Sequence, residues 1–387
     1  GITSEGGLYA GVIFEVDPNT HTVIKKADFD GLNGLNPQGG LVEVGGKIYG
    51  TTPNGGLNNN GVIYSYDLAT SALTKVKDFD EINGGSNFSG LMKASNGKLY
   101  GTTYRGGAFN FGILFEYDLI LDTLISKFEF NGTSTGRDPE AVPLEASNGK
   151  LYGTTFQGGS NFVGILYEYD LTTDSATAIV DFSVTNGAGF KGPMIESSTG
   201  KIYGVTGSGG KPSLDDGVVY EYDISTKTII VRAYFDENTV GRGGRELMEA
   251  SNGRFFGTSS INYGNPNNGA SLYEFIPSAD TLISRSVLSG YAGIGLIELV
   301  SNNSASILES EVFRDLSIYP NPTKSILNID TEGEKIVSVK VFTISGQLVE
   351  SELNTNNTLD VSNYKNGMYI LQVETQKGTA ISRFIKQ

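Results

Sequence analysis

The chain has 387 residues, no cysteine and a single histidine, with a formal net charge of −15 and an isoelectric point of about 4.6. An acidic chain of this kind repels nucleic acid and anionic membrane surfaces, so we expect neither as a partner. The lack of cysteine excludes disulfides, thiol catalysis and cysteine-ligated zinc. No apolar run approaches the roughly twenty residues that a membrane-spanning helix requires.

A short glycine-centred motif recurs along most of the chain. In its clearest copies the motif reads Lys-(Ile/Leu)-Tyr-Gly-Thr-Thr-x-x-Gly-Gly. The copies recur about every fifty residues, which is typical of a unit that buries its apolar face only by stacking on copies of itself. Six copies align on a central glycine, at Gly1, Gly50, Gly101, Gly153, Gly204 and Gly257.

One copy, from Gly90 to Phe130, contains four β-strand signals, and its first two strands flank an Asn-Gly hairpin turn. The expected strands are residues 91–94, 98–103, 112–118 and 123–130. Four antiparallel strands in about fifty residues correspond to one blade of a kelch-like β-propeller. The glycine at each anchor predicts a close approach of another part of the backbone, or a bulge.

The points within the repeat unit at which the first copy begins and the last copy stops indicate how the propeller closes. Gly1 falls just after the position of the Lys-Ile-Tyr segment, and residues 295–303 resemble the segment beginning at Gly90, which precedes that position. Because residues 1–303 thus amount to about six repeats, we predict six blades of four antiparallel strands, closed by pairing of the last strand with the first. The alternative is a longer ring that has lost upstream repeats. The start at Gly1, without a signal-like segment, predicts a processed or truncated form.

The repeat motif, followed by Gly-(Val/Ile)-(Ile/Leu)-(Tyr/Phe)-x-Tyr-Asp, resembles the GloVer tandem repeats of secreted bacterial proteins. The sixth copy departs from this pattern, because residues 259–263 replace the Gly-Gly pair. The resemblance implies a repeat architecture and an extracellular location, and it brings no catalytic residues with it.

The repeat stops after residue 303. Residues 304–311 are predicted to be a polar linker, and the alternating apolar runs and glycine turns of residues 312–387 predict a small antiparallel β-sandwich. The order Tyr-Pro-Asn-Pro, Gly-Gln-Leu-Val, Asn-Gly-Met-Tyr-Ile-Leu and a terminal lysine resembles the C-terminal sorting domain of the type IX secretion system in Bacteroidota. The residues that carry this resemblance are Tyr319, Pro320, Asn321, Pro322, Gly346, Gly367, Tyr369 and Lys386.

The sorting-domain resemblance implies that the type IX secretion machinery is a partner. It also implies export across the outer membrane and a secreted or cell-surface location. An ordinary accessory sandwich is the alternative.

Residue patterns for catalysis and metal binding are sparse. The one histidine, His21, lies in a predicted turn and is interpreted as a solvated turn residue rather than a ligand, and a single histidine excludes the two-histidine zinc motif. Aspartates that recur at the end of the third strand are interpreted as turn caps rather than calcium ligands. Glu145, Glu196 and Glu249 share one repeat position and are interpreted as scaffold, so no acid–base pair stands out. We expect no metal and no cofactor.

The loop between the second and third strands differs most between copies and combines aromatic side chains with Asn amides. These groups suit the CH faces and hydroxyls of sugars, and variable loops on one face of a repeat scaffold commonly bind ligands. The alternative is that the aromatic rings pack between blades while the Asn residues support turns. The candidate ligand-binding residues are Tyr104, Arg105, Phe109, Asn110, Phe111, Phe156, Gln157, Asn161, Phe162 and Tyr263.

These observations predict a secreted or cell-surface β-propeller that acts as a non-catalytic binding module for a glycan or a surface protein. A propeller enzyme that acts on extracellular polysaccharide, either a lyase or a hydrolase, is the second hypothesis. A structural role at the cell surface is the third.

Overall fold

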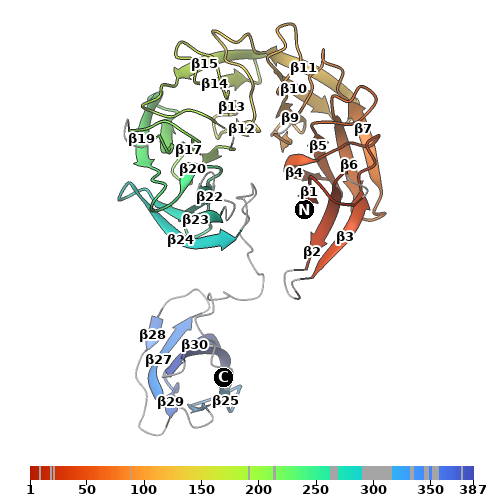
Figure 1. The fold of residues 1–387 in the computed structure, drawn as a ribbon. Coiled ribbons are helices and arrows are strands. Elements are labelled where there is room, and N and C mark those ends of the chain that lie inside the picture. The colour runs from red at the N-terminus through yellow and green to blue at the C-terminus, as the bar shows by residue number, and fades with distance from the viewer. Residues whose placement is uncertain are drawn as a thin grey trace. The chain divides into compact units, whose positions relative to one another are not determined.

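A computed structural model describes the chain as two compact units, residues 1–298 and 299–387 (Figure 1). The residues described are 1–7, 10–17, 20, 22–87, 89–190, 192–211, 215–261, 269–289, 316–331, 335–343, 348–350, 357–375 and 378–387. Every regular element among them is a β-strand. The predicted linker, residues 304–311, lies outside the described residues, so its limits stay a prediction.

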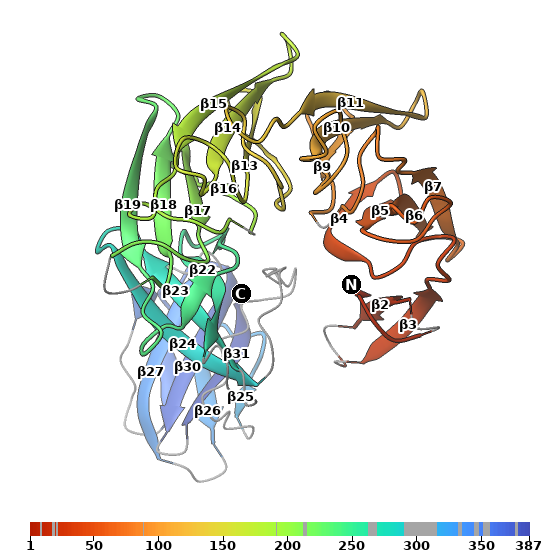
Figure 2. The same ribbon diagram turned by 45° about the horizontal axis from the view of Figure 1, so that its top comes forward.

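The first unit contains six antiparallel sheets that follow one another along the chain and around an arc (Figures 1 and 2). The first sheet contains β1 (Ile2–Thr3), β2 (Val12–Val16) and β3 (Val23–Asp28). The second contains β4 (Gln38–Val44), β5 (Lys47–Thr52), β6 (Val62–Asp67) and β7 (Leu73–Asp78). The third contains β8 (Met92–Lys93), β9 (Leu99–Thr102), β10 (Ile113–Asp118) and β11 (Thr123–Glu129). These last bounds agree with the four strands predicted for this copy.

The remaining three sheets continue the order. The fourth contains β12 (Leu144–Glu145), β13 (Lys150–Thr154), β14 (Ile165–Asp170) and β15 (Ser175–Asp181). The fifth contains β16 (Ile195–Glu196), β17 (Lys201–Val205), β18 (Val218–Asp223) and β19 (Thr228–Tyr234). The sixth contains β20 (Arg242–Gly244), β21 (Met248–Glu249), β22 (Phe255–Ile261), β23 (Gly269–Ile276) and β24 (Thr281–Ser289).

The six sheets confirm the β-propeller prediction, with two departures from four strands per blade. The first sheet has three strands among the described residues, and the sixth has five because β20 pairs with β22 beside β21. The segment predicted to close the ring, residues 295–303, lies outside the described residues, so closure stays a prediction.

The anchor glycines make room for an aromatic ring of the next strand. A Cβ atom at Gly153 would lie 2.1 Å from the hydroxyl of Tyr167, and one at Gly101 would lie 2.6 Å from Cζ of Phe115. Tyr167 and Phe115 are buried. The close approach is therefore to a ring, and at Gly101 the predicted approach of backbone is also present, since its Cβ atom would lie 2.8 Å from the carbonyl oxygen of Gly90. The bulge falls between the third and fourth strands of the sheet.

Neighbouring sheets are joined by buried rings and by a repeated polar clamp. Tyr152 of the fourth sheet packs with Tyr222 of the fifth, with ring centroids 6.1 Å apart. Ser147 donates from its backbone N–H and its hydroxyl to the two carboxylate oxygens of Glu196, at 2.7 and 2.6 Å. Pairs Ser95–Glu145 and Ser198–Glu249 repeat this clamp, which supports the interpretation of these glutamates as scaffold.

The recurring aspartates cap turns, as the sequence predicts. Oδ1 of Asp118 accepts hydrogen bonds from the backbone N–H groups of Ile120 and Leu121, at 2.9 and 3.0 Å. These bonds favour the ionised carboxylate and hold the pKa of Asp118 below its ordinary value.

The second unit is a sandwich of two antiparallel sheets, in agreement with the prediction. One sheet contains β25 (Ser317–Tyr319), β26 (Ile326–Asp330) and β29 (Thr358–Asp360). The other contains β28 (Leu348–Glu350), β27 (Ile336–Thr343), β30 (Gly367–Thr375) and β31 (Gly378–Lys386). Leu327 and Leu359 of the first sheet pack with Val341, Leu371 and Val373 of the second in one buried core.

Residues of the sorting motif join the segment after the first strand of this sandwich, β25, to its last strand, β31. Asn321 lies between the two prolines of the Tyr-Pro-Asn-Pro segment, and its amide donates to the carbonyl of Arg383 at 2.8 Å and accepts from the N–H of Ile385 at 2.9 Å. Tyr369 stacks on Phe384 with centroids 5.5 Å apart. Gly346 lies outside the described residues.

Candidate functional site

The connection between β19 and β21 forms a strand of its own, β20, whereas the corresponding pairing in the second sheet belongs to the long strand β4. Arg242 of β20 lies opposite Ser260 of β22, and Gly244 lies opposite Ser259. The glycine is required at 244, since a Cβ atom there would lie 2.6 Å from Cζ of Phe235 and close to the fifth sheet. The Arg-Gly-Gly-Arg segment therefore holds its two arginines against the preceding blade.

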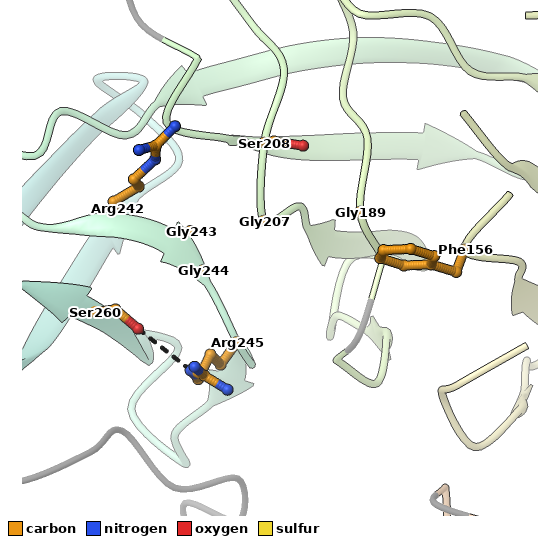
Figure 3. Close-up of a pocket in the computed structure, with 9 residues that line it drawn as sticks. All are labelled: Phe156, Gly189, Gly207, Ser208, Arg242, Gly243, Gly244, Arg245 and Ser260. Carbon is orange, nitrogen blue, oxygen red and sulfur yellow. Dashed lines mark hydrogen bonds between the residues drawn. The ribbon is translucent and has the colours of Figure 1, made fainter. Parts of the chain in front are cut away.

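A pocket of about 350 Å³ opens beside this strand (Figure 3). This volume falls in the range of small-molecule sites in proteins. In Figure 3 the ring of Phe156 lies on one side, and the side chains of Arg242 and Arg245 lie on the other. The lining residues are Phe156, Gly189, Gly207, Ser208, Arg242, Gly243, Gly244, Arg245 and Ser260.

Arg242 is held by a buried acid. Its Nε lies 3.1 Å from Oδ1 of Asp216, and its Nη2 donates to the backbone carbonyl of Asp215 at 3.2 Å. Asp216 is only 7% exposed and also accepts the backbone N–H of Glu237 at 2.9 Å. The positive charge of Arg242 is therefore compensated within the protein, and this side chain serves mainly to fix the wall of the pocket.

Arg245 has weaker constraints. Its backbone N–H donates to the carbonyl of Thr258 at 2.9 Å, while its Nε donates to the hydroxyl of Ser260 at 3.4 Å. Within the described part of the chain, no carboxylate lies within the 4.0 Å of an ion pair from its guanidinium. Arg245 thus brings to the pocket a positive charge that no carboxylate of the described residues pairs with, in a protein of net charge −15.

Among the predicted residues that the structure describes, Phe156 is the one that lines this pocket. Its neighbour Gln157 accepts a hydrogen bond from Arg137, whose guanidinium lies over the ring of Phe111, 5.4 Å from the centroid. These three side chains form a contact between the third and fourth repeats. Tyr263 lies outside the described residues, as does His21.

The other predicted residues lie on loops away from the pocket lining. Phe109 and Phe162 are exposed at loop tips, with 55% and 72% of their surfaces accessible. Asn110 accepts the backbone N–H of Gly106 at 3.0 Å, and Asn161 donates to a backbone carbonyl at 2.8 Å, so both amides support turns. On the third repeat, the Tyr104 side chain is half-buried and Arg105 pairs through its backbone with Gly85. A role of these loops in ligand binding stays a prediction.

The sequence contains a signal for Arg245 in the connection between two blades, outside the repeated motifs. The residue three positions before the innermost strand is Ser89 in the third sheet, Ala141 in the fourth and Gly192 in the fifth. In the sixth sheet that residue, counted from β21, is Arg245. The change from a small residue to a long, charged residue is visible when the connections between blades are aligned, rather than the loops within each blade.

The described residues show neither a cluster of metal ligands nor a membrane-spanning helix. The described part of the chain contains no group of three or more His, Asp or Glu side chains arranged to hold a metal ion. It also contains no helix with the length and hydrophobicity needed to cross a membrane.

Solved structures resemble this chain at low sequence identity. A fungal alcohol oxidase of the AA5 family, in complex with copper, superposes with a TM-score of 0.50 at 14% identity, over 100% of this chain and 92% of that chain. PorZ, a surface component of the type IX secretion system of Porphyromonas gingivalis, has a TM-score of 0.38 at 14% identity, over 98% and 62%. TolB from Acinetobacter baumannii has a TM-score of 0.43 at 16% identity, over 73% and 61%. The chain therefore spans less than two thirds of the length of PorZ and TolB.

Sequence families match both units. Residues 1–142 and 122–303 match the Gloeobacter/Verrucomicrobia repeat, and residues 317–387 match the secretion system C-terminal sorting domain. No curated protein matches the chain in sequence. The protein belongs to the Gloeobacter/Verrucomicrobia repeat family and carries a type IX sorting domain, which directs it to the cell surface or the extracellular space.

Proposed function

We propose that the protein is a non-catalytic binding module that holds an extracellular glycan in the pocket beside β20. The observation that carries this proposal is the pairing of the Phe156 ring with hydrogen-bond donors across a pocket of about 350 Å³. An aromatic face packs well against the CH face of a sugar ring, while arginine, serine and backbone groups bond to its hydroxyls. Glycine at several lining positions leaves the backbone accessible to a ligand.

The composition of the pocket favours binding over catalysis. The nine described residues that line it include no Asp, Glu, His or Tyr, which are the usual acids and bases of polysaccharide-cleaving enzymes. Glu145, Glu196 and Glu249 are engaged in clamps between sheets. Among the described lining residues, none is an acid or base that would carry the lyase or hydrolase hypothesis.

Export supports an extracellular ligand. The sorting domain directs the chain out of the cell, where polysaccharides and surface proteins are the available macromolecules. We favour a glycan over a surface protein because the pocket is small and concave, whereas a protein partner needs a surface of several hundred square ångströms.

A thermal-shift and calorimetry screen of the full chain against neutral and acidic polysaccharides tests this proposal. A ligand that binds the folded state raises the Tm in proportion to its occupancy. We expect saturable binding of at least one glycan without release of product. Phe156→Ala should weaken that binding by several-fold to about tenfold, because the ring contact is lost.

A second variant separates the pocket from the wider loop face predicted from the sequence. Phe162→Ala removes a ring of the same loop that is 72% exposed and does not line the pocket. Binding that is lost in Phe162→Ala and kept in Phe156→Ala would move the site to the loop tips. Absence of binding to every glycan would overturn the proposal, and release of reducing ends would favour an enzyme.

A further inference from the structure

We propose that the ligand of this pocket is an acidic glycan, and that Arg245 binds the carboxylate of a uronic acid unit. This inference rests on the proposed glycan-binding function and specifies its ligand class. It comes from the charge of the pocket, the position of Arg245 in the repeat, and the arrangement of its side chain opposite Phe156.

The charge of the pocket is the first observation. The chain has a net charge of −15, yet two arginines line the pocket and the described lining residues include no acid. Arg242 is paired with Asp216 behind the wall, whereas Arg245 has only the hydroxyl of Ser260 as a side-chain partner among the described residues. A serine hydroxyl does not neutralise a guanidinium, so Arg245 offers charge and unused N–H donors to an anion.

The second observation is the position of Arg245 in the repeat. The blade scaffold does not require a long side chain there. The corresponding residues Ser89 and Ala141 are buried, with 6% and 3% of their surfaces exposed, and Gly192 occupies the same place in the fifth sheet. A small residue satisfies the packing in those copies. The arginine therefore serves something other than the contact between blades.

The third observation is the geometry of the pocket. Phe156 comes from the fourth repeat and Arg245 from the sixth, and the lining residues Gly189 and Gly207 add no side chains to the pocket (Figure 3). A sugar ring that packs on Phe156 can thus direct a substituent toward Arg245. The planar fork of a guanidinium matches a carboxylate through two parallel hydrogen bonds, which a neutral hydroxymethyl group cannot form.

Calorimetry with the full chain and two forms of one ligand tests this inference. The probes are a short oligogalacturonate and its fully methyl-esterified form, which share their rings and linkages and differ in charge. We expect the acid form to bind about tenfold or more tightly than the ester, as for hydrogen bonds to charged groups. The difference should shrink at high salt, because ions screen the charge.

Three variants assign the effect to a residue. Arg245→Gln should abolish the difference in affinity between the acid form and the ester, with the larger loss on the acid form. Arg245→Lys keeps the charge without the fork and should give an intermediate affinity. Arg254→Gln is the matched control, because it removes the same charge from a side chain that pairs with Glu274 outside the pocket lining; Arg285 remains beside that glutamate. This control should bind the acid form as the unchanged protein does.

The other outcomes overturn the inference in distinguishable ways. Equal binding of acid and ester, unaffected by Arg245→Gln, would refute the carboxylate site and leave the glycan-binding proposal standing. Tight binding of a sulfated glycan, without binding of the oligogalacturonate, would show that the pocket binds a sulfate group and not a carboxylate. No binding of either probe, or of any neutral glycan, would overturn both the inference and the proposed function.

Discussion

The junction between the fourth and fifth sheets and the junction between the fifth and sixth sheets use the same scaffold but differ in what they add to it. Both contain a serine–glutamate clamp, Ser147–Glu196 in one and Ser198–Glu249 in the other. Among the described residues, only the second inserts a separate strand, β20, and Arg242 in this strand and Arg245 just after it line the pocket. The shared residues thus hold blades together, and the candidate site arises where one copy departs from the repeat.

The largest effect is expected from a change in the shared scaffold. Gly153→Ala would place a methyl group about where the hydroxyl of the buried Tyr167 lies, since the Cβ would be 2.1 Å from that oxygen. Overpacking of this kind costs about 1–3 kcal/mol or more. We expect a clear decrease in the free energy of unfolding, measured by urea denaturation.

Gly40→Ala is the matched control for this change. A Cβ atom at Gly40 meets nothing within 4 Å, so the variant should unfold at nearly the same urea concentration as the unchanged protein. If both alanine variants were equally stable, the aromatic ring would not be the reason for the anchor glycine.

A change in β20, at the junction between the fifth and sixth sheets, should weaken glycan binding more than it lowers the free energy of unfolding. Gly244→Ala would bring a Cβ atom to 2.6 Å from Phe235 and 2.7 Å from Val205, so β20 must move away from the fifth sheet. We expect a loss of stability of about 1–2 kcal/mol, because a short strand can shift, together with loss of glycan binding. Thermal melts and calorimetry on the same sample measure both. Unchanged binding would show that the position of β20 does not define the site.

Both junctions contain a serine–glutamate clamp, so matched variants of the two glutamates compare the junctions directly. Glu196→Ala and Glu249→Ala each remove an acceptor of two hydrogen bonds at the surface, and each should cost about 1 kcal/mol. Glu249→Ala should leave glycan binding unchanged, since Glu249 does not line the pocket. A much larger cost at Glu249 than at Glu196 would mean that the sixth sheet depends on its clamp in a way that the fifth does not.

The sequence predicted the architecture well because its signals are repeated. The strand pattern of the copy from Gly90 to Phe130 and the order of motifs in the sorting domain each follow from local residues. The structure confirms the first, and the family match confirms the second. The capping role of Asp118 was also predictable, because an aspartate followed by a short turn bonds to its own backbone.

The pocket could not be predicted in the same way. Phe156 was found because it lies in a variable loop, but the arginines lie in a connection between blades, where each copy has a different sequence. Their proximity depends on β20 pairing with β22, a long-range contact that no local pattern specifies. The rings of Phe109 and Phe162 have the chemistry of a sugar-binding site, yet exposure at a loop tip does not by itself place a residue in a pocket.

The smallest predicted effect concerns acid stability and again separates the regular sheets from the sixth. Oδ1 of Asp170 accepts the hydroxyl of Thr172 and the backbone N–H groups of Thr172 and Thr173, and Lys150 lies 3.3 Å from its other oxygen. The Thr172 hydroxyl bond is the largest cause that holds the pKa of Asp170 well below its ordinary value of 3.8. Asp223 of the fifth sheet shows the same shift, whereas Ile276 ends the corresponding strand of the sixth.

The sign of the pH dependence follows from these lowered pKa values. The folded state favours the ionised carboxylate, so its stabilising contribution is complete above the unfolded pKa of 3.8 and is lost as the pH falls toward the folded value. We expect the Tm to be nearly constant from about pH 7 to about pH 5 and to fall below about pH 4. Asp170→Asn keeps an oxygen acceptor for the turn but cannot titrate, so its Tm should be lower at neutral pH and fall less in acid. An acid profile identical to that of the unchanged protein would show that this turn contributes nothing to acid sensitivity, and would shift the cause to carboxylates outside the repeated turns.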